Sequence, residues 1–285
     1  MIVVTGATGN VGSQLVRTLA EQGEKVVAVS RGEKPVDPAW GNAAGVEYRR
    51  ADLDDLDSLA EAVSGARALF LLITGPQLIS GPEPTRVLET VAAAGVRRVV
   101  FVSSQAAVTR SDSAGYARTL EFERALADSD LEWTVLRPGA FATNTFAWIE
   151  PIRAQRMIPA PFGDVGLPVV DPADIAAMAA AALTGTGHHG QAYTVTGPEL
   201  ITPRQQAQAI AEAFGEPLQF VELTREQALG NMIRFMPEPV AEHTLEILGT
   251  PTPEEQRIST DVERALGRPA SGYAAWAQRN IAAYR

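Results

Sequence analysis

The chain has 285 residues, of which 46% are hydrophobic, and its formal net charge is −10. This length and composition suit one large domain, or a domain with a smaller lobe attached. The absence of cysteine excludes disulfides, thiolate metal sites and a cysteine nucleophile, and it fits a reducing cytoplasm. The acidic balance disfavours nucleic-acid binding, because it repels a phosphate backbone.

The start of the sequence and its apolar runs predict a cytoplasmic protein without a membrane segment. Residues 1–6 enter a strand at once, with no basic stretch and apolar run of a signal peptide ahead of them. Apolar runs such as 176–183 are far shorter than the about 20 residues that a membrane-spanning helix needs. The histidines, at positions 188, 189 and 243, lack a metal-ligand spacing, so no metal site is predicted.

Short apolar runs alternate with amphipathic runs up to residue 139. Strands are expected at 1–6, 25–30, 45–50, 67–74, 96–104 and 131–139, and helices at 10–23, 56–65, 83–95 and 115–129. Such alternation indicates right-handed parallel crossovers. The sequence therefore predicts an α/β fold with a doubly wound parallel sheet, covered by helices on both faces.

The alternation loosens after residue 139. Residues 140–170 are rich in proline, glycine and aromatic side chains, as loops are, and 151–166 suit either a flexible lid or a plain connection. From Thr202 the chain is mostly helical. One apolar group in this part suits the core of a small lobe most simply, and also a substrate pocket or the contact of a homodimer: Met232, Ile233, Phe235 and Met236.

We therefore predict two parts. Residues 1–150 form a Rossmann-like domain, and a helix and a strand within 168–196 return to it. Residues 151–167 and 197–285 form a smaller, mostly helical lobe. Ligands of open α/β sheets bind at the carboxyl ends of the strands, so a cleft between the two parts is the expected site.

Three glycines lie between the first expected strand and the first helix. Gly6 permits the tight turn, Gly9 lets the backbone approach a pyrophosphate, and Gly12 lets helix and strand pack closely. The free N–H groups at the helix start point toward bound phosphates. An ordinary glycine-rich turn has the same residues, but the strand–turn–helix context favours dinucleotide binding.

The end of the second strand indicates which dinucleotide is bound. An NAD site usually has a carboxylate there, which binds the ribose hydroxyls. This chain has Ser30 and Arg31 instead, and a guanidinium binds a 2′-phosphate in a bidentate manner. Glu33 lies close enough to weaken the inference, and a solvent-facing arginine is the alternative. We predict NADP(H), preferred over NAD(H).

Several motifs together resemble those of the NmrA-like family, atypical members of the short-chain dehydrogenase/reductase superfamily. They are Thr5–Gly12, Ser30–Arg31, Asp52–Leu53, Ala94–Ser104, Ser129, Trp133–Asn144, Val169–Ala177 and Tyr193–Thr202. The resemblance implies a Rossmann-like domain with NAD(P) across the strand ends. Some members reduce quinones or related acceptors with NAD(P)H, and others bind the nucleotide as redox sensors with little or no turnover.

The resemblance also implies which residues meet the ligands. Those at the cofactor are Thr8, Asn10 and Val11 in the glycine loop, Asp52 and Leu53 at the adenine, Thr74, Gly75 and Pro76 at the ribose and diphosphate, and Ser103 near the nicotinamide. Phe141 and Asn144 line the substrate cleft. Ser103 and Ser104 end the fifth strand, where the hydroxyls either bond cofactor or substrate or cap the next segment.

Most catalytic members of the wider superfamily use a Tyr-x-x-x-Lys pair, in which the lysine lowers the pKa of the tyrosine. Tyr116 stands in a suitable place here, but Leu120 occupies the lysine position. The only lysines of the sequence are Lys25 and Lys34, near the second strand. Tyr116 remains the candidate catalytic residue, as a hydrogen-bond donor to a carbonyl, or is an ordinary half-buried aromatic.

We predict an NADPH-dependent oxidoreductase that transfers hydride to a small apolar or aromatic acceptor, such as a quinone or enone, without the usual dyad. Such a transfer needs mainly close alignment, and the product oxygen takes its proton from water. The apolar run 141–152 suits a substrate cleft and favours this prediction. The missing lysine favours the alternative, a non-catalytic NADP(H)-sensing regulator that acts through a protein partner.

Overall fold

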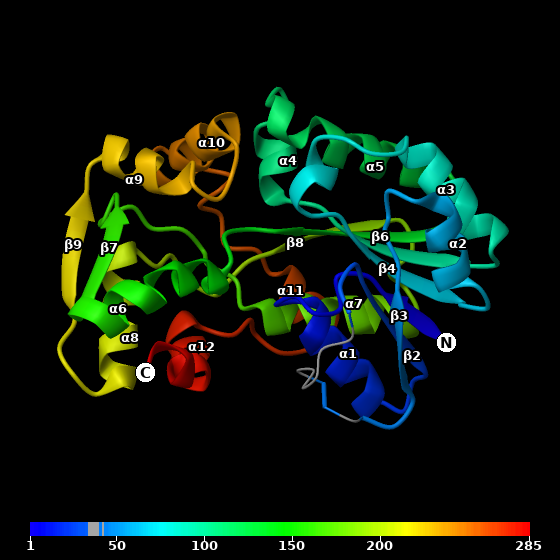
Figure 1. Cartoon of the computed structure of the whole chain (residues 1–285), viewed down its shortest axis with the longest axis horizontal. Coiled ribbons are helices and arrows are strands. Elements are labelled where there is room, and N and C mark those ends of the chain that lie inside the picture. Colours follow the sequence, from blue (N-terminus) through cyan, green and yellow to red (C-terminus); the bar gives the residue numbers. More distant parts are fainter. Residues whose placement is uncertain (34–39, 42) are drawn as a thin grey trace. The chain divides into compact units, whose positions relative to one another are not determined.

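A computed structural model of the chain describes residues 1–33, 40–41 and 43–285 (Figure 1). The chain forms two compact units. The first comprises Met1–Pro138, Pro172–Val195 and Arg264–Gly267, and the second comprises Gly139–Asp171, Thr196–Glu263 and Arg268–Arg285. Within the described residues, none of the helices combines the length and the apolar character that a bilayer crossing requires.

The first unit is built on a seven-stranded sheet in the order β3-β2-β1-β4-β5-β6-β8. Its strands are β1 (Ile2–Val4), β2 (Val26–Ser30), β3 (Val46–Arg50), β4 (Ala68–Leu72), β5 (Arg98–Val102), β6 (Glu132–Pro138) and β8 (Gln191–Val195). Every neighbouring pair is parallel. The strand order changes direction at β1 and β4, where a doubly wound sheet places its ligand crevice. The predicted α/β class is confirmed.

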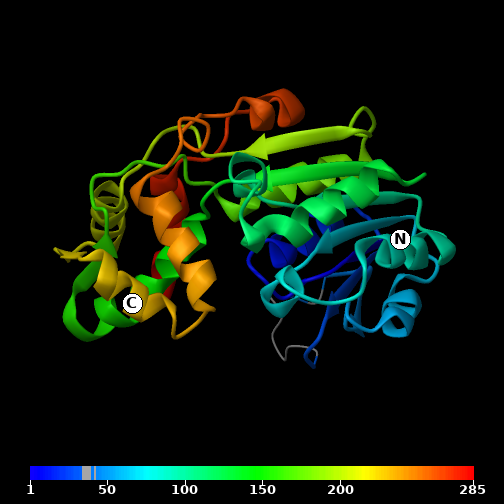
Figure 2. The same cartoon turned by 90° about the horizontal axis from the view of Figure 1, so that it is seen from above.

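Helices cover both faces of this sheet. They are α1 (Gly12–Glu21), α2 (Leu56–Val63), α3 (Pro84–Ala93), α4 (Gln105–Thr109), α5 (Ala117–Ala127) and α7 (Pro172–Thr184), with short 3-10 turns at Gly75–Leu78 and Ala114–Tyr116. Figure 1 shows α1 and α7 on one face and α2, α3 and α5 on the other. In Figure 2 the strands follow one another from β8, in yellow-green at one edge, toward the blue strands at the other.

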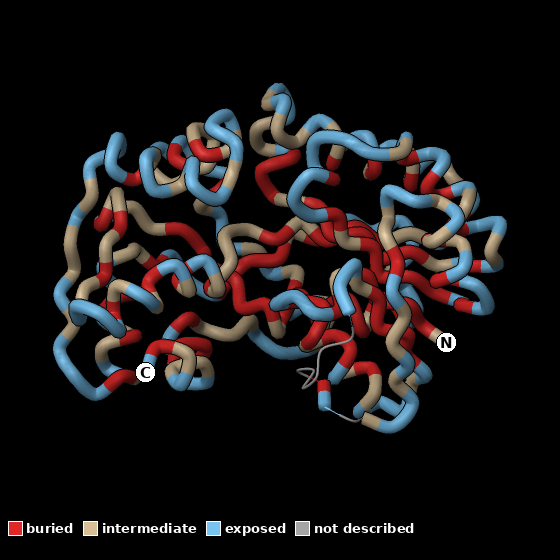
Figure 3. Tube along the Cα trace, in the orientation of Figure 1, coloured by how far each residue is buried: buried red, intermediate tan, exposed pale blue. Residues whose placement is uncertain are grey.

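Alternate residues of the central strands bury their side chains beneath α2, α3 and α5. Val3, Leu69 and Phe101 are fully buried, and they pack with Leu88 and Phe122 from the covering helices. This period of two on strands meets the period of 3.6 on helices in one continuous core. Figure 3 shows the buried residues concentrated along these strands.

The second unit contains a two-stranded parallel sheet and six helices in the described chain. Its strands are β7 (Met157–Pro161) and β9 (Gln219–Leu223). Its helices include α6 (Ile149–Gln155), α8 (Pro203–Phe214), α9 (Arg225–Met232), α10 (Glu238–Gly249) and α12 (Tyr273–Asn280), and 3-10 turns lie at Ala142–Trp148 and Ile281–Tyr284. A sixth helix, α11 (Asp261–Leu266), runs from this unit into the first. The core of the second unit includes Trp148, Ile158, Ile210 and Trp276.

Three expectations need correction. The segment 151–166 is not a loop, because it holds most of α6 and all of β7, and buried Ile158 and Ala160 anchor that strand. The first unit ends at Pro138 rather than at residue 150, since Ala142 and Trp148 pack into the second core. The expected lobe core around Met232 is wrong in part, because Ile233 is 48% exposed and Phe235 is 86% exposed.

Candidate functional site

The glycine loop after β1 has the close-packed geometry that a phosphate cradle needs. Gly6 adopts a left-handed conformation with φ of 61°. A Cβ built on Gly12 would lie 2.2 Å from the carbonyl oxygen of Gly6, so no larger residue fits without opening the turn. Thr8, Gly9 and Asn10 are exposed at the tip, and Val11 is buried just before α1.

The start of α1 is suited to an anion. In the described part of the chain no side chain caps this helix, and no acidic residue lies in its first turn. The free backbone N–H groups and the helix dipole therefore favour a phosphate at this point. The close packing of Gly12 on the backbone of Gly6 and the uncapped helix start together fit a dinucleotide diphosphate.

Thr5 fixes the loop to the strand beside it, a role that sequence reasoning missed. Its hydroxyl donates to the carbonyl of Phe70 at 3.0 Å and accepts from the amide of Leu72 at 2.9 Å. On the other side, the amide of Ala7 donates to the carbonyl of Val29 at 3.1 Å. The loop is thus held to both neighbouring strands, β2 and β4, before any ligand binds.

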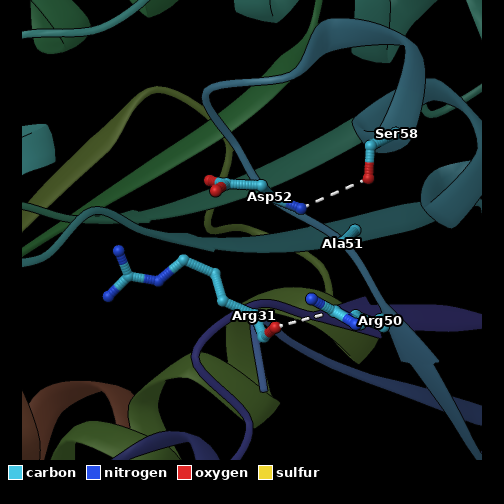
Figure 4. Close-up of a pocket in the computed structure, with 5 residues that line it drawn as sticks. All are labelled: Arg31, Arg50, Ala51, Asp52 and Ser58. Carbon is cyan, nitrogen blue, oxygen red and sulfur yellow. Dashed lines mark hydrogen bonds between the residues drawn. The ribbon is translucent and has the colours of Figure 1, made fainter. Parts of the chain in front are cut away.

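A pocket of about 250 Å³ lies at the carboxyl ends of β2 and β3 and is lined by Arg31, Arg50, Ala51, Asp52 and Ser58 (Figure 4). The side chains of Arg31 and Asp52 extend to the same side. The amide of Asp52 donates to the hydroxyl of Ser58 at 3.3 Å, which fixes the residue after β3. Leu53 is half-buried and packs on the main core.

The carboxylate of Glu33 does not pair with Arg31. It accepts a hydrogen bond from Arg50 at 3.1 Å, and Arg50 also donates from Nε to the carbonyl oxygen of Arg31 at 3.0 Å. Within the described residues no acidic side chain pairs with the Arg31 guanidinium, which is exposed. Among the described residues, therefore, no carboxylate neutralises the charge of Arg31.

The segment after β4 is held by an arginine that the sequence did not single out. Thr74, Gly75 and Pro76 are exposed, and Gly75 has φ of 60°. Arg118 donates from Nε to the carbonyl of Gln77 at 2.8 Å and from a terminal nitrogen to the carbonyl of Pro82 at 2.6 Å. The start of α5 thus fixes the loop that carries the three predicted residues.

Ser103 and Ser104 have different partners at the end of β5. The hydroxyl of Ser103, which is buried, donates to the carboxylate of Glu123 on α5. Arg137 on β6 pairs with the same carboxylate at 2.5 Å and 3.1 Å. The hydroxyl of Ser104 accepts the amide of Ala106 at 3.2 Å and so caps α4, which was the alternative to a ligand contact.

Tyr116 ends a 3-10 turn, lies directly before α5 and is half-buried. Leu120 follows it on the helix, where the usual dyad has lysine. Lys25 precedes β2, and Lys34 falls outside the described residues. No described lysine therefore lies on α5.

Two of the three predicted substrate residues, Phe141 and Asn144, lie in the second unit. Phe141 is half-buried at the start of the 3-10 segment, and its carbonyl accepts the amide of exposed Asn144 at 3.0 Å. The neighbouring Thr145 is buried and accepts a hydrogen bond from the hydroxyl of Tyr273 at 2.8 Å. Asn144 is thus an exposed amide on a well-anchored turn.

A family model described as NAD(P)H-binding matches residues 6–186, which include the glycine loop, the Arg31 pocket and the Ser103 network. The chain belongs to this NAD(P)H-binding family. The predicted NmrA-like resemblance and the binding of NAD(P)H are confirmed.

Three similar proteins extend the likeness over the whole of this NAD(P)H-binding chain. A (4-alkanoyl-5-oxo-2,5-dihydrofuran-3-yl)methyl phosphate reductase of Streptomyces griseus is 37% identical, over 100% of this chain and 99% of the relative. An NAD(P)H azoreductase of Xenophilus azovorans is 32% identical, over 100% and 99%. The NADPH complex of the Escherichia coli quinone oxidoreductase QOR2 has a TM-score of 0.78 and 25% identity, and the match covers 98% of this chain and 99% of that one.

Proposed function

We propose that this chain transfers hydride from NADPH to a small apolar or aromatic acceptor, such as a quinone or enone, without a Tyr-Lys dyad. The chain is an NAD(P)H-dependent oxidoreductase. The observation that carries the proposal is the absence of lysine from α5, in a unit that keeps the diphosphate cradle at Gly6 and Gly12. This combination suits an acceptor that needs no positioned proton donor.

Separate groups of residues bind the cofactor and the acceptor in the proposed reaction. The glycine loop and the start of α1 hold the diphosphate, and Thr74–Pro76 border the ribose. The nicotinamide cofactor, when bound, supplies a hydride. The acceptor gains this hydride and one proton, and water delivers the proton because no lysine lies on α5 beside Tyr116. Tyr116 donates a hydrogen bond to the acceptor oxygen.

The names of three relatives support a conjugated acceptor, and one of those acceptors also carries a phosphate. One relative is named for the reduction of an unsaturated ring that carries carbonyl groups, a second for azo reduction and a third for quinone reduction. All three acceptors are conjugated and need little more than an aligned hydride donor. The proposal places a small molecule as the partner in a cytoplasmic reaction, and the exposed Phe235 is the place to look for a homodimer contact.

We further propose NADP(H) as the preferred cofactor, with Arg31 as the recognition residue. The support is the unpaired guanidinium of Arg31 within the described residues, at the pocket beyond β2. No carboxylate ends β2, where an NAD site usually has one. A guanidinium binds a phosphate with two parallel hydrogen bonds, and NADH offers it no such partner.

A screen of NADPH oxidation with quinones, enones and aldehydes, run beside calorimetric NADPH binding, tests the reaction. Turnover is expected with quinones or enones and little turnover with unactivated aldehydes. Tight binding without turnover on any acceptor would overturn the proposal in favour of a nucleotide sensor. Tyr116→Phe is expected to lower kcat, by roughly the tenfold that one lost hydrogen bond of about 1.4 kcal/mol represents, and leave NADPH binding unchanged.

A further inference from the structure

A second arginine shares the pocket with Arg31. Arg50 is the last residue of β3 and pairs in register with Ser30 of β2. Its Nε donates to the carbonyl oxygen of Arg31 at 3.0 Å, so the backbone of one arginine fixes the side chain of the other. Both line the same pocket, as Figure 4 shows.

The carboxylate of Glu33, which now pairs with Arg50, competes only weakly with a phosphate for this arginine. Its terminal nitrogen lies 3.1 Å from the carboxylate of Glu33, and the two side chains are 67% and 89% exposed. Exposed ion pairs contribute little, because water screens the charges and two long side chains lose freedom. A phosphate carrying nearly two negative charges attracts the guanidinium more strongly than this carboxylate does.

The remaining wall of the pocket decides where a phosphate binds. The carboxylate of Asp52 repels a phosphate, and its Oδ1 accepts the amide of Asp54 at 3.1 Å. The favourable contacts for a phosphate are therefore the guanidinium groups of Arg31 and Arg50, and Asp52, which extends to the same side as Arg31, opposes them. The hydroxyl of Ser30 lies 2.7 Å from the hydroxyl of Tyr48 and forms a hydrogen bond with it, so we assign Ser30 no contact with the phosphate.

We propose that Arg50 is a second cation for the 2′-phosphate of NADP(H), and that Glu33 weakens NADP(H) binding by competing for it. The inference rests on the proposed preference for NADP(H). One guanidinium leaves part of the phosphate charge uncompensated, and a second one held on the Arg31 carbonyl compensates it. Among the described residues, Arg31, Arg50 and Glu33 then set the cofactor selectivity.

Calorimetric dissociation constants for NADPH and NADH test the proposal in single variants of the full chain. Arg50→Ala is expected to weaken NADPH binding about tenfold, as loss of a charge-assisted hydrogen bond does, and change NADH binding less than twofold. Glu33→Gln should tighten NADPH binding about twofold to threefold and leave NADH binding unchanged. Arg50→Lys should restore part of the loss, since it keeps the charge and loses the fork.

The neighbouring arginine provides a matched control. Arg49 lies on the same strand but pairs with Glu47 at 2.8 Å and donates to the carbonyl of Ala62 at 3.1 Å, away from the pocket. Arg49→Ala should leave the ratio of the two dissociation constants unchanged. Binding of adenosine 2′,5′-bisphosphate and of adenosine 5′-monophosphate isolates the phosphate, and only the bisphosphate should weaken in Arg50→Ala.

The outcomes separate this inference from the proposal on which it rests. If the wild-type protein has equal dissociation constants for NADPH and NADH, and Arg31→Ala changes neither constant, the NADP(H) preference is wrong. The proposed role of Arg50 is then wrong as well. If Arg31→Ala lowers the selectivity and Arg50→Ala does not, the preference stands and the inference about Arg50 is overturned. If NADPH binding depends less on salt concentration in Arg50→Ala than in the wild type, the direct charge contact of Arg50 is supported.

Discussion

Gly12→Ala is expected to destabilise the protein and to weaken cofactor binding. The new Cβ would lie 2.2 Å from the carbonyl oxygen of Gly6, 2.7 Å from its carbon and 2.9 Å from the Cα of Ala7. All three are backbone atoms, so the turn itself must open. Overpacking of this kind costs about 1–3 kcal/mol, and the higher helix propensity of alanine offsets at most about 1 kcal/mol. With about 2 kcal/mol for the overpacking and the full offset of about 1 kcal/mol, the expected net loss is about 1 kcal/mol.

The opened turn also moves the amides that we propose bind the diphosphate. Loss of one such charge-assisted hydrogen bond, about 1.5–3 kcal/mol, weakens NADPH binding at least tenfold. Urea denaturation measures the stability, and calorimetry measures the NADPH dissociation constant. Gly230→Ala is the matched control, because this glycine lies within α9 and a Cβ there meets nothing within 4 Å. It should gain up to about 1 kcal/mol and leave NADPH binding unchanged.

The reasoning about the turn would be refuted by one result. If Gly12→Ala unfolds at the same urea concentration as the wild type and binds NADPH within twofold, the contact with Gly6 is not a constraint. Loss of stability without loss of binding would instead show that the turn relaxes away from the ligand amides. The Gly230→Ala control separates both results from a general effect of alanine in helices.

Three further predictions concern other parts of the structure. Thr145→Val should cost about 1–3 kcal/mol in urea denaturation, because the buried hydroxyls of Tyr273 and Tyr284, 2.8 Å and 3.0 Å from Thr145 Oγ1, lose a partner, and a loss below 0.5 kcal/mol would contradict it. Arg118→Ala should raise the KM for NADPH about threefold to tenfold without changing the NADPH/NADH selectivity, since it frees the carbonyls of Gln77 and Pro82, and an unchanged KM would refute this role. Burial and then the charge of Arg98 lower the pKa of His188 from 6.5, so the unfolded chain binds more protons just below that pH and stability falls as pH drops below 6.5. His188→Asn should flatten this decline between pH 7.5 and 5.5 in urea denaturation and His189→Asn should keep it, and equal slopes in all three proteins would speak against it.

The sequence determined the fold class and the tight glycine turn because both depend on local patterns. Alternating strands and helices allow few chain paths, and the parallel sheet with helices on both faces follows from them. The three glycines act within one turn, and the tight contact between Gly12 and Gly6 spans only six positions along the chain. A constraint of such short range can be read from the order of residues alone.

Segments of proline and glycine were harder to predict. Residues 157–161 contain two prolines and suggested a loop, yet they form β7 beside β9. A two-stranded sheet has only edge strands, where proline is tolerated. The composition of such a strand therefore does not distinguish it from a loop. The boundary at Pro138 likewise depends on which core receives Trp148, and sequence position does not decide that.

The tertiary structure alone decided which charges meet. Glu33 stands two residues from Arg31 in the sequence, yet it pairs with Arg50, which the parallel register of β2 and β3 carries alongside. Ser103 directly follows β5, Glu123 lies on α5 and Arg137 lies on β6. They share hydrogen bonds only because the sheet and its covering helix bring them together. Local periodicity fixes each element, but the partners of a side chain depend on how distant elements pack, and the long-range contacts that set this packing leave no repeat in the sequence.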